Sequence, residues 1–199
     1  FDPADYLDKK KARHMDRFAQ FAMVAMQEAQ WQAELSMEQT DPTRVATIVG
    51  SGIGGISTLS EQFQVLNDRG PSRVSPFLIP MMLPDMASGQ ISMALGAKGP
   101  NMCTVSSCSS GAEAIGTAWN MIRQGEVDVA FAGGTEAPIC PIAVAGFSSC
   151  QALSRRNDDP TAASRPFDAE RDGFVMGEGS AILVLESLES VQKRNAPVL

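Results

Sequence analysis

The 199-residue chain has the length and composition of one globular domain or lobe. Hydrophobic residues make up 44% and charged residues 20% of it, which is ordinary for a folded protein and excludes a disordered chain. A net charge of −7 disfavours general binding to nucleic acid, and no apolar run is long enough to span a membrane. We therefore expect neither nucleic acid nor membrane as a partner.

The four cysteines, at positions 103, 108, 140 and 150, have neither metal-ligand spacing nor the density of a secreted domain. We therefore expect reduced thiols, no metal site and a cytoplasmic location. No basic-then-apolar signal segment opens the sequence. Because the chain begins without Met, a preceding targeting peptide stays an open alternative.

Residues 11–34 are predicted to form one long helix, because apolar residues recur there at helical spacing. Its inward stripe is Met15, Phe18, Phe21 and Ala25. A basic cluster crowds the same segment of an otherwise acidic chain: Lys9, Lys10, Lys11, Arg13 and Arg17. The cluster favours encounter with an acidic partner, and a solvated helix face explains it equally well. His14, the only histidine, is interpreted as a surface residue.

Residues 45–49 are predicted to form a buried strand that runs directly into GSGIGG at 50–55. That motif fits the G-x-G-x-x-G pattern of dinucleotide-binding folds. Such folds also need a second strand that ends in an acidic residue about twenty positions later. Residues 62–67 instead have a helical pattern and Asp68 falls in a predicted turn, so the glycine motif alone is a weak indication of nucleotide binding.

Prolines and methionines crowd residues 75–102. The prolines predict an irregular path at first and a helix from about residue 86 to 95. Methionine side chains adapt to varied apolar shapes, which suits an apolar tunnel or a subunit contact. Ordinary core packing explains them equally well.

The candidate nucleophile is Cys108, in SSCSSG at 106–111. The apolar run 102–105 is expected to be a strand, and a helical pattern follows the cysteine until Gly125. A helix N-terminus directs unpaired N–H groups and a positive dipole end at the thiol, which favours the reactive thiolate. The alternative is a buried structural cysteine.

The helix after Cys108 is expected to turn one apolar stripe inward, formed by Ala112, Ile115, Trp119 and Ile122. Residues 127–131 are then expected to form a buried strand, which completes a strand, helix, strand unit. Glu136 and Glu178 lie in glycine-bearing turns, where carboxylates either order loops by accepting backbone N–H groups or take part in the site. We expect the ordering role, because nothing in the sequence places a partner base or metal ligand beside them. The mixed charges of residues 154–172 predict a loop paired within itself.

Five motifs follow one another in the second half of the chain: SSCSSG at 106–111, AGGTE at 132–136, ALSRRND at 152–158, SRPFD at 164–168 and RDGFVMGEG at 171–179. Together they resemble the β-ketoacyl-acyl-carrier-protein synthases, most closely the type II enzyme of dissociated fatty-acid synthesis. The resemblance runs from about residue 9 to the end of the chain and is weakest over residues 30–41.

The resemblance implies an α/β fold, a thiolase-like layered α/β sandwich. Residues 1–199 would be the N-terminal ketosynthase domain, truncated at both ends and forming mainly the first of the two pseudo-symmetric halves of the fold. The complete protein would form a homodimer. The implied reaction is a decarboxylative Claisen condensation. In it Cys108 takes an acyl group from a carrier thioester, and malonyl-carrier protein then loses carbon dioxide and attacks that acyl group. The resemblance implies no cofactor and no metal.

The resemblance also assigns residues to the reaction. Ile53, Leu78 and Phe147 match acyl-pocket positions of the family, and Leu78 stands where a family member commonly has Phe. The carrier-docking positions are Lys9, Lys10 and Arg13, so acyl carrier protein is the expected partner.

Two family histidines that assist decarboxylation have no match, since His14 fits no catalytic motif. We therefore interpret the chain as an internal fragment that is inactive alone. A non-catalytic chain-length factor stays an alternative, although its relatives typically lack the cysteine. Type I isozymes and polyketide ketosynthase domains stay open as well, and chain-length preference depends on residues partly outside this segment.

Overall fold

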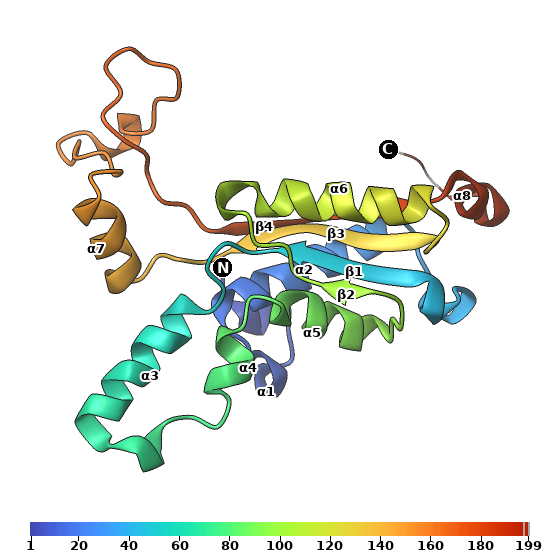
Figure 1. The fold of residues 1–199 in the computed structure, drawn as a ribbon, viewed down its shortest axis with the longest axis horizontal. Helices are drawn as coiled ribbons and strands as arrows, with labels where there is room; N and C mark the ends of the chain where they lie inside the picture. The colour runs from blue at the N-terminus through green and yellow to red at the C-terminus, as the bar shows by residue number, and fades with distance from the viewer. Residues whose placement is uncertain (197, 199) are drawn as a thin grey trace.

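The computed structural model describes residues 1–196 and 198. A mixed sheet in the order β2-β1-β3-β4 forms its centre, and helices cover both faces (Figure 1). β1 (Val45–Gly50) runs parallel to β2 (Asn101–Met102) on one side and to β3 (Val129–Glu136) on the other. β4 (Gly179–Glu186) is antiparallel to β3. The predicted layered α/β architecture is confirmed.

The sheet separates two apolar cores. α2 (Arg17–Gln32) and α5 (Met86–Leu95) pack on one face, and α6 (Ser110–Arg123) packs on the other. Alternate β1 side chains serve the two cores: Val45 and Val49 belong to the first, Ala46 and Ile48 to the second. All six β1 residues are buried, as expected for a strand covered by helices on both sides.

Five further helices lie outside this centre: α1 (Lys9–Ala12), α3 (Ile56–Arg69), α4 (Leu78–Met82), α7 (Pro141–Ser149) and α8 (Leu188–Arg194). Figure 1 shows α3 and α7 reaching away from the sheet at the end where β3 runs out, and α8 lying at the opposite end. The predictions of a buried strand at 45–49 and of a helix over 86–95 are confirmed by β1 and α5.

The single long helix predicted over residues 11–34 is wrong. α1 ends at Ala12 and α2 begins at Arg17, with Asp16 as its N-cap. The Asp16 carboxylate is buried, accepts the Phe18 N–H at 3.3 Å, and also accepts the N–H and hydroxyl of Thr58 at 2.9 and 2.6 Å. Its side chain thus takes up backbone donors that would otherwise be orphaned, which starts a new helix at this point.

The inward stripe predicted for α6 is also partly wrong. Ala114 and Ala118 are buried on its sheet-facing side, whereas Ala112 is exposed and Trp119 keeps 53% of its surface, with the Arg123 guanidinium 4.7 Å from its ring. Only small side chains fit where the helix approaches the sheet closely. Of the predicted stripe, Ile115 and Ile122 pack partly buried at the flank.

The strands beside α6 differ from expectation in length. The strand expected over 102–105 is limited to Asn101–Met102, whereas the next strand runs beyond the predicted 127–131 to Glu136. After β2 the chain bonds to other segments: Thr104 accepts the Ser51 N–H at 3.3 Å, and its hydroxyl donates to the Ser110 carbonyl at 2.8 Å. Gly125 ends the helical segment with a φ of +73°, as predicted.

Candidate active site

Cys108 lies at the end of the sheet where β1 and β3 finish. It occupies the 3-10 turn Ser107–Ser109 that leads into α6, and its side chain is exposed. The carboxyl ends of parallel strands are the usual place for sites in α/β sheets. The predicted elbow therefore exists, although an irregular segment rather than a strand leads into it.

Serine side chains hold the elbow in an uncommon backbone conformation. Ser107 has a φ of +56°, in the left-handed region that costs about 1–3 kcal/mol for a residue with a side chain. The Ser110 hydroxyl donates to the Ser107 carbonyl at 2.7 Å and accepts the Ser106 N–H at 3.0 Å. The Ser109 hydroxyl donates to the Ser106 carbonyl at 2.8 Å. These bonds fix the turn that presents the thiol.

Glycines allow the start of α6 to lie directly on the strand ends. A Cβ on Gly50 would collide with the Ser110 carbonyl, and a Cβ on Gly134 would lie 2.9 Å from the Cα of Gly111. Backbone atoms cannot move aside as a flexible side chain can. The two strand ends thus determine where α6, and with it Cys108, begins.

Glu136 orders the loop of the glycine motif, as its interpretation from the sequence predicts. Its carboxylate accepts the Gly52 N–H at 2.6 Å and the Ser51 hydroxyl at 3.0 Å, while the Ser51 oxygen accepts the Gly54 N–H at 3.0 Å. Gly55 packs so closely on α4 that a Cβ there would collide with the Met81 carbonyl. The loop is thus occupied by contacts within the protein.

The alternative of dinucleotide binding fails on topology. α3 follows the glycine loop, and among the described residues no strand lies between β1 and β2 to end in the acidic residue that ribose binding needs. Asp68 is in the last turn of α3, exposed, rather than in the turn predicted for it.

The three residues matched to an acyl pocket come from separate segments and are each partly buried. Ile53 belongs to the glycine loop and Leu78 begins α4, and the structure packs these two segments against each other through Gly55. Phe147 lies in α7, with its ring edge-on to Phe174 at a centroid distance of 5.3 Å.

The basic cluster divides into free and engaged side chains. Lys9, Lys10 and Arg13 are exposed on α1 and its C-cap. Arg17 instead donates to Glu178 at 2.8 Å, with its guanidinium 4.8 Å from the Phe21 ring. His14 is exposed, as predicted, and its ring stacks on Phe77 at 3.9 Å.

The loop over residues 154–172 is paired within itself, as predicted. Asp172 accepts the Ser154 hydroxyl at 2.7 Å and the Arg155 N–H at 2.9 Å, and lies 3.4 Å from the Arg165 guanidinium. The hydrogen bond from Ser154 and the other donors hold the pKa of Asp172 below its ordinary value. Glu178, beyond this loop, accepts the Ile139 N–H at 3.1 Å, which agrees with its predicted role in ordering loops.

All four thiols are free. Cys103 is half-buried, and burial raises its pKa, with the charges of Asp85 and Glu136 acting in the same direction. Cys140 is buried, whereas Cys150 is exposed like Cys108. No group of metal-ligating side chains occurs within residues 1–196 and 198, and no helix there is long and apolar enough to cross a membrane.

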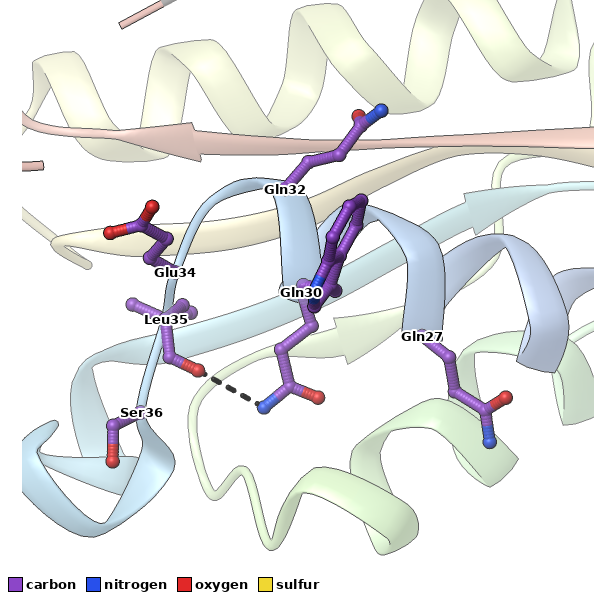
Figure 2. A pocket seen from close by; sticks show the side chains of 7 residues that line it. Gln27, Gln30, Gln32, Glu34, Leu35 and Ser36 are labelled. Carbon is purple, nitrogen blue, oxygen red and sulfur yellow. Dashed lines mark hydrogen bonds between the residues drawn. The ribbon is translucent and has the colours of Figure 1, made fainter. Parts of the chain in front are cut away.

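A surface hollow of about 720 Å³ lies away from this site, at the end of α2 (Figure 2). Glutamine side chains and Trp31, which is 79% exposed, line much of it. Within it Gln30 donates to the Leu35 carbonyl at 3.2 Å. It brings no nucleophile to a base, so the elbow remains the candidate site.

Comparison with known proteins agrees with this geometry. A family model described as "Beta-ketoacyl synthase, N-terminal domain" matches residues 1–190. Over 198 residues the chain is 52% identical to the 3-oxoacyl-[acyl-carrier-protein] synthase 2 of Synechocystis sp. and to that of Staphylococcus aureus. The alignments include 100% of this chain, and 48% of the Synechocystis protein and 49% of the Staphylococcus aureus protein. The chain thus spans about half the length of the curated relatives it matches.

Solved structures give the same result. A β-ketoacyl synthase from Burkholderia phymatum matches with a TM-score of 0.88 and 34% identity, over 99% of this chain and 48% of the other. A ketosynthase solved with its type II polyketide acyl-carrier protein matches with a TM-score of 0.82 and 26% identity, over 98% and 54%. The thiolase-like fold is therefore confirmed. The chain belongs to the beta-ketoacyl synthase family, whose N-terminal domain it matches from residue 1 to residue 190.

Proposed function

We propose that the protein is a 3-oxoacyl-[acyl-carrier-protein] synthase that uses Cys108 as its nucleophile in fatty-acid chain elongation. The observation that carries the proposal is the exposed Cys108 on the serine-fixed turn at the N-terminus of α6. The 52% identity to synthases of that name supports the substrate class.

The first step is acyl transfer. The Cys108 thiolate attacks the thioester carbonyl of an acyl carrier, the carbon–sulfur bond to the carrier breaks, and the carrier sulfur leaves and takes up a proton. The elbow fixes the position of the thiol directly before α6, and the exposure of Cys108 leaves its sulfur accessible to a carrier thioester.

The second step is condensation. Malonyl-carrier protein loses carbon dioxide, and the resulting carbanion attacks the carbonyl of acyl-Cys108. The new carbon–carbon bond releases β-ketoacyl-carrier protein and returns the Cys108 sulfur as thiolate. No cofactor enters this sequence of steps.

The His14 ring stacks on Phe77 at a centroid distance of 3.9 Å, and we assign His14 no part in decarboxylation. The relatives are about twice as long as this chain. We therefore assign condensation to the protein at the full length of its relatives, and expect residues 1–199 alone to be inactive.

Substrate and partner residues complete the proposal. Ile53, Leu78 and Phe147 are assigned to the acyl pocket, and their partial burial leaves apolar surface for a chain. Acyl carrier protein is assigned to the exposed Lys9, Lys10 and Arg13, because carrier proteins are acidic and complementary charge speeds encounter. A structural relative solved with its carrier protein supports that partner class.

A homodimer and a cytoplasmic location remain part of the proposal. Exposed apolar side chains support a subunit contact, which would cover some of them; Met93, Val105 and Ile142 are examples, at 64%, 61% and 57% exposure. The free thiols support a reducing compartment.

The test is acylation followed by mass spectrometry of the protein at its full natural length. Incubation with an acyl-carrier thioester should add one acyl group, on the peptide that contains Cys108, and malonyl-carrier protein should then release it as the β-ketoacyl product. Cys108→Ala should abolish both steps, whereas Cys150→Ala, at the other exposed thiol, should leave them unchanged. An unacylated wild-type protein would favour a non-catalytic chain-length factor instead.

A further inference from the structure

We propose that Glu136 is a positioning residue for the nucleophile: it acts through the glycine loop to hold the elbow that carries Cys108. This inference rests on the proposed function of Cys108. Glu136 itself need not touch substrate, and its role is assigned from four contacts at the carboxyl ends of β1 and β3.

The first two contacts tie Glu136 to the glycine loop. Glu136 is the last residue of β3, and its two carboxylate oxygens accept from the Gly52 N–H at 2.6 Å and the Ser51 hydroxyl at 3.0 Å. Hydrogen bonds to an ionised acceptor are shorter and about twice as strong as neutral ones. Within residues 1–196 and 198 Glu136 forms no ion pair, so these donors are the groups that stabilise its charge.

The third contact passes from the loop to the elbow. Gly52 is close to both Glu136 and Ser107: a Cβ built on it would be 3.0 Å from the Glu136 Oε2 and 3.5 Å from the Ser107 carbonyl oxygen. The same face of Gly52 therefore lies beside both the carboxylate and the elbow. If Glu136 no longer holds the loop, Ser107 loses the surface against which it packs.

The fourth contact is the bond from the Ser110 hydroxyl to the Ser107 carbonyl, and it shows why the packing of Gly52 beside Ser107 matters. Ser107 is left-handed at a φ of +56°, a conformation that persists only where its surroundings over-determine it. Ser110 restrains it from the helix side through a 2.7 Å bond to the Ser107 carbonyl. The loop that Glu136 holds lies beside the same Ser107 carbonyl, and Cys108 is the next residue along the chain.

Under this proposal Glu136 positions the elbow through its hydrogen bonds rather than through its charge. In Glu136→Gln the amide oxygen can accept from Gly52, while the amide NH₂ donates to the free lone pair of Ser51. Glu136→Ala removes both bonds. A displacement of about 1 Å at a reacting atom costs up to about 10²-fold in rate.

The experiment compares these variants in the protein at its full natural length, with acyl transfer measured well below the midpoint of thermal unfolding. Glu136→Ala should lower kcat by about 10- to 100-fold with little change in KM, and Glu136→Gln should restore kcat to within about threefold of wild type. Ser51→Ala, which removes one of the two Glu136 bonds together with the Gly54 N–H bond to the Ser51 oxygen, should fall between them. It also serves as the informative variant if Glu136→Ala does not fold.

Glu178→Ala is the matched control, because Glu178 also accepts a loop N–H, from Ile139 at 3.1 Å, but pairs with Arg17 rather than with the glycine loop. It should lower thermal stability without changing kcat. Wild-type kcat in both Glu136→Ala and Ser51→Ala would overturn the inference, and so would a Glu136→Gln enzyme as slow as Glu136→Ala.

Failure of the underlying function would be visible separately. If Cys108→Ala retained acyl transfer, the nucleophile assignment itself would be wrong. If Cys108→Ala abolished transfer while the Glu136 and Ser51 variants kept it, only the positioning role would fail.

Discussion

Gly111, in the first turn of α6, lies directly against Gly134 of β3, where an added Cβ would come 2.9 Å from the Gly111 Cα. We expect Gly134→Ala to push the start of α6 away from the sheet and to move Cys108 with it. Overpacking of this kind costs about 1–3 kcal/mol in the free energy of unfolding. Acylation of Cys108, measured by mass spectrometry over time, should slow by about tenfold or more.

The matched control is Gly116→Ala, in the interior of the same helix. A Cβ there meets no atom within 4 Å, so this change should stabilise the protein by about 0.5–1 kcal/mol through helix propensity alone. Its acylation rate should equal that of wild type. Equal rates and equal stabilities for Gly134→Ala and Gly116→Ala would contradict the close contact.

The ion pair of Arg44 with Asp128 should give the protein a defined response to acid. Arg44 binds the Asp128 carboxylate through two nitrogens, at 2.9 and 2.8 Å, and also donates to the carbonyls of Glu126 and Gly125. The bond from Arg44 holds the pKa of Asp128 below its ordinary value of about 3.9, with burial opposing that shift. A lowered folded-state pKa stabilises the protein above the unfolded value and loses that effect as pH falls through the folded one.

We therefore expect Asp128→Asn to cost up to about 1 kcal/mol in the free energy of unfolding near pH 7, since both side chains are partly exposed and screened. The difference from wild type should shrink as pH falls below about 4. Urea unfolding at a series of pH values measures it. If the loss in the free energy of unfolding caused by Asp128→Asn persisted undiminished at low pH, this assignment would be wrong.

Charge reversal at Lys10 and Arg13 tests carrier docking. In the protein at its full natural length, the double change Lys10→Glu and Arg13→Glu should raise the KM for carrier-bound substrates about tenfold, because complementary charge mainly governs encounter. The rate at which iodoacetamide alkylates Cys108 should not change. The increase in KM should weaken at high salt.

Lys98→Glu is the control for that experiment, since Lys98 is also exposed but follows α5 rather than lying on α1. It should leave the carrier KM unchanged. If reversal at Lys10 and Arg13 also left it unchanged, the basic face of α1 would be only a solvated surface.

The parts of the fold that depend on hydrophobic patterning were predictable from the sequence. The continuous apolar run of β1 and the helical spacing of α5 each led to the right element. The break between α1 and α2 was not predictable in this way, because it depends on a hydrogen bond that the Thr58 N–H donates to the Asp16 carboxylate, 42 residues away. Periodicity reports local burial and contains no information about such distant partners.

The sequence predicted Cys108 as the candidate nucleophile, but it did not predict the contacts that fix the turn around it. The SSCSSG motif and the following helix indicate an exposed Cys108, which the structure has. Sequence reasoning missed Ser110 as the residue that fixes Ser107, and the Gly111 contact with Gly134. The runs of small residues around both were the available signal. These runs do not indicate which small residues contact each other, because segments distant in the sequence meet only in the folded protein.

The most direct test of the whole account is the order in which the four thiols react. Limited treatment of the folded, full-length protein with iodoacetamide, followed by peptide mass spectrometry, should modify Cys108 first. Cys150, which is also exposed but lies at the C-terminal end of α7, should follow more slowly, and Cys103 and Cys140 should follow last. Modification of Cys150, Cys103 or Cys140 ahead of Cys108 would contradict the assignment of Cys108 as the activated nucleophile.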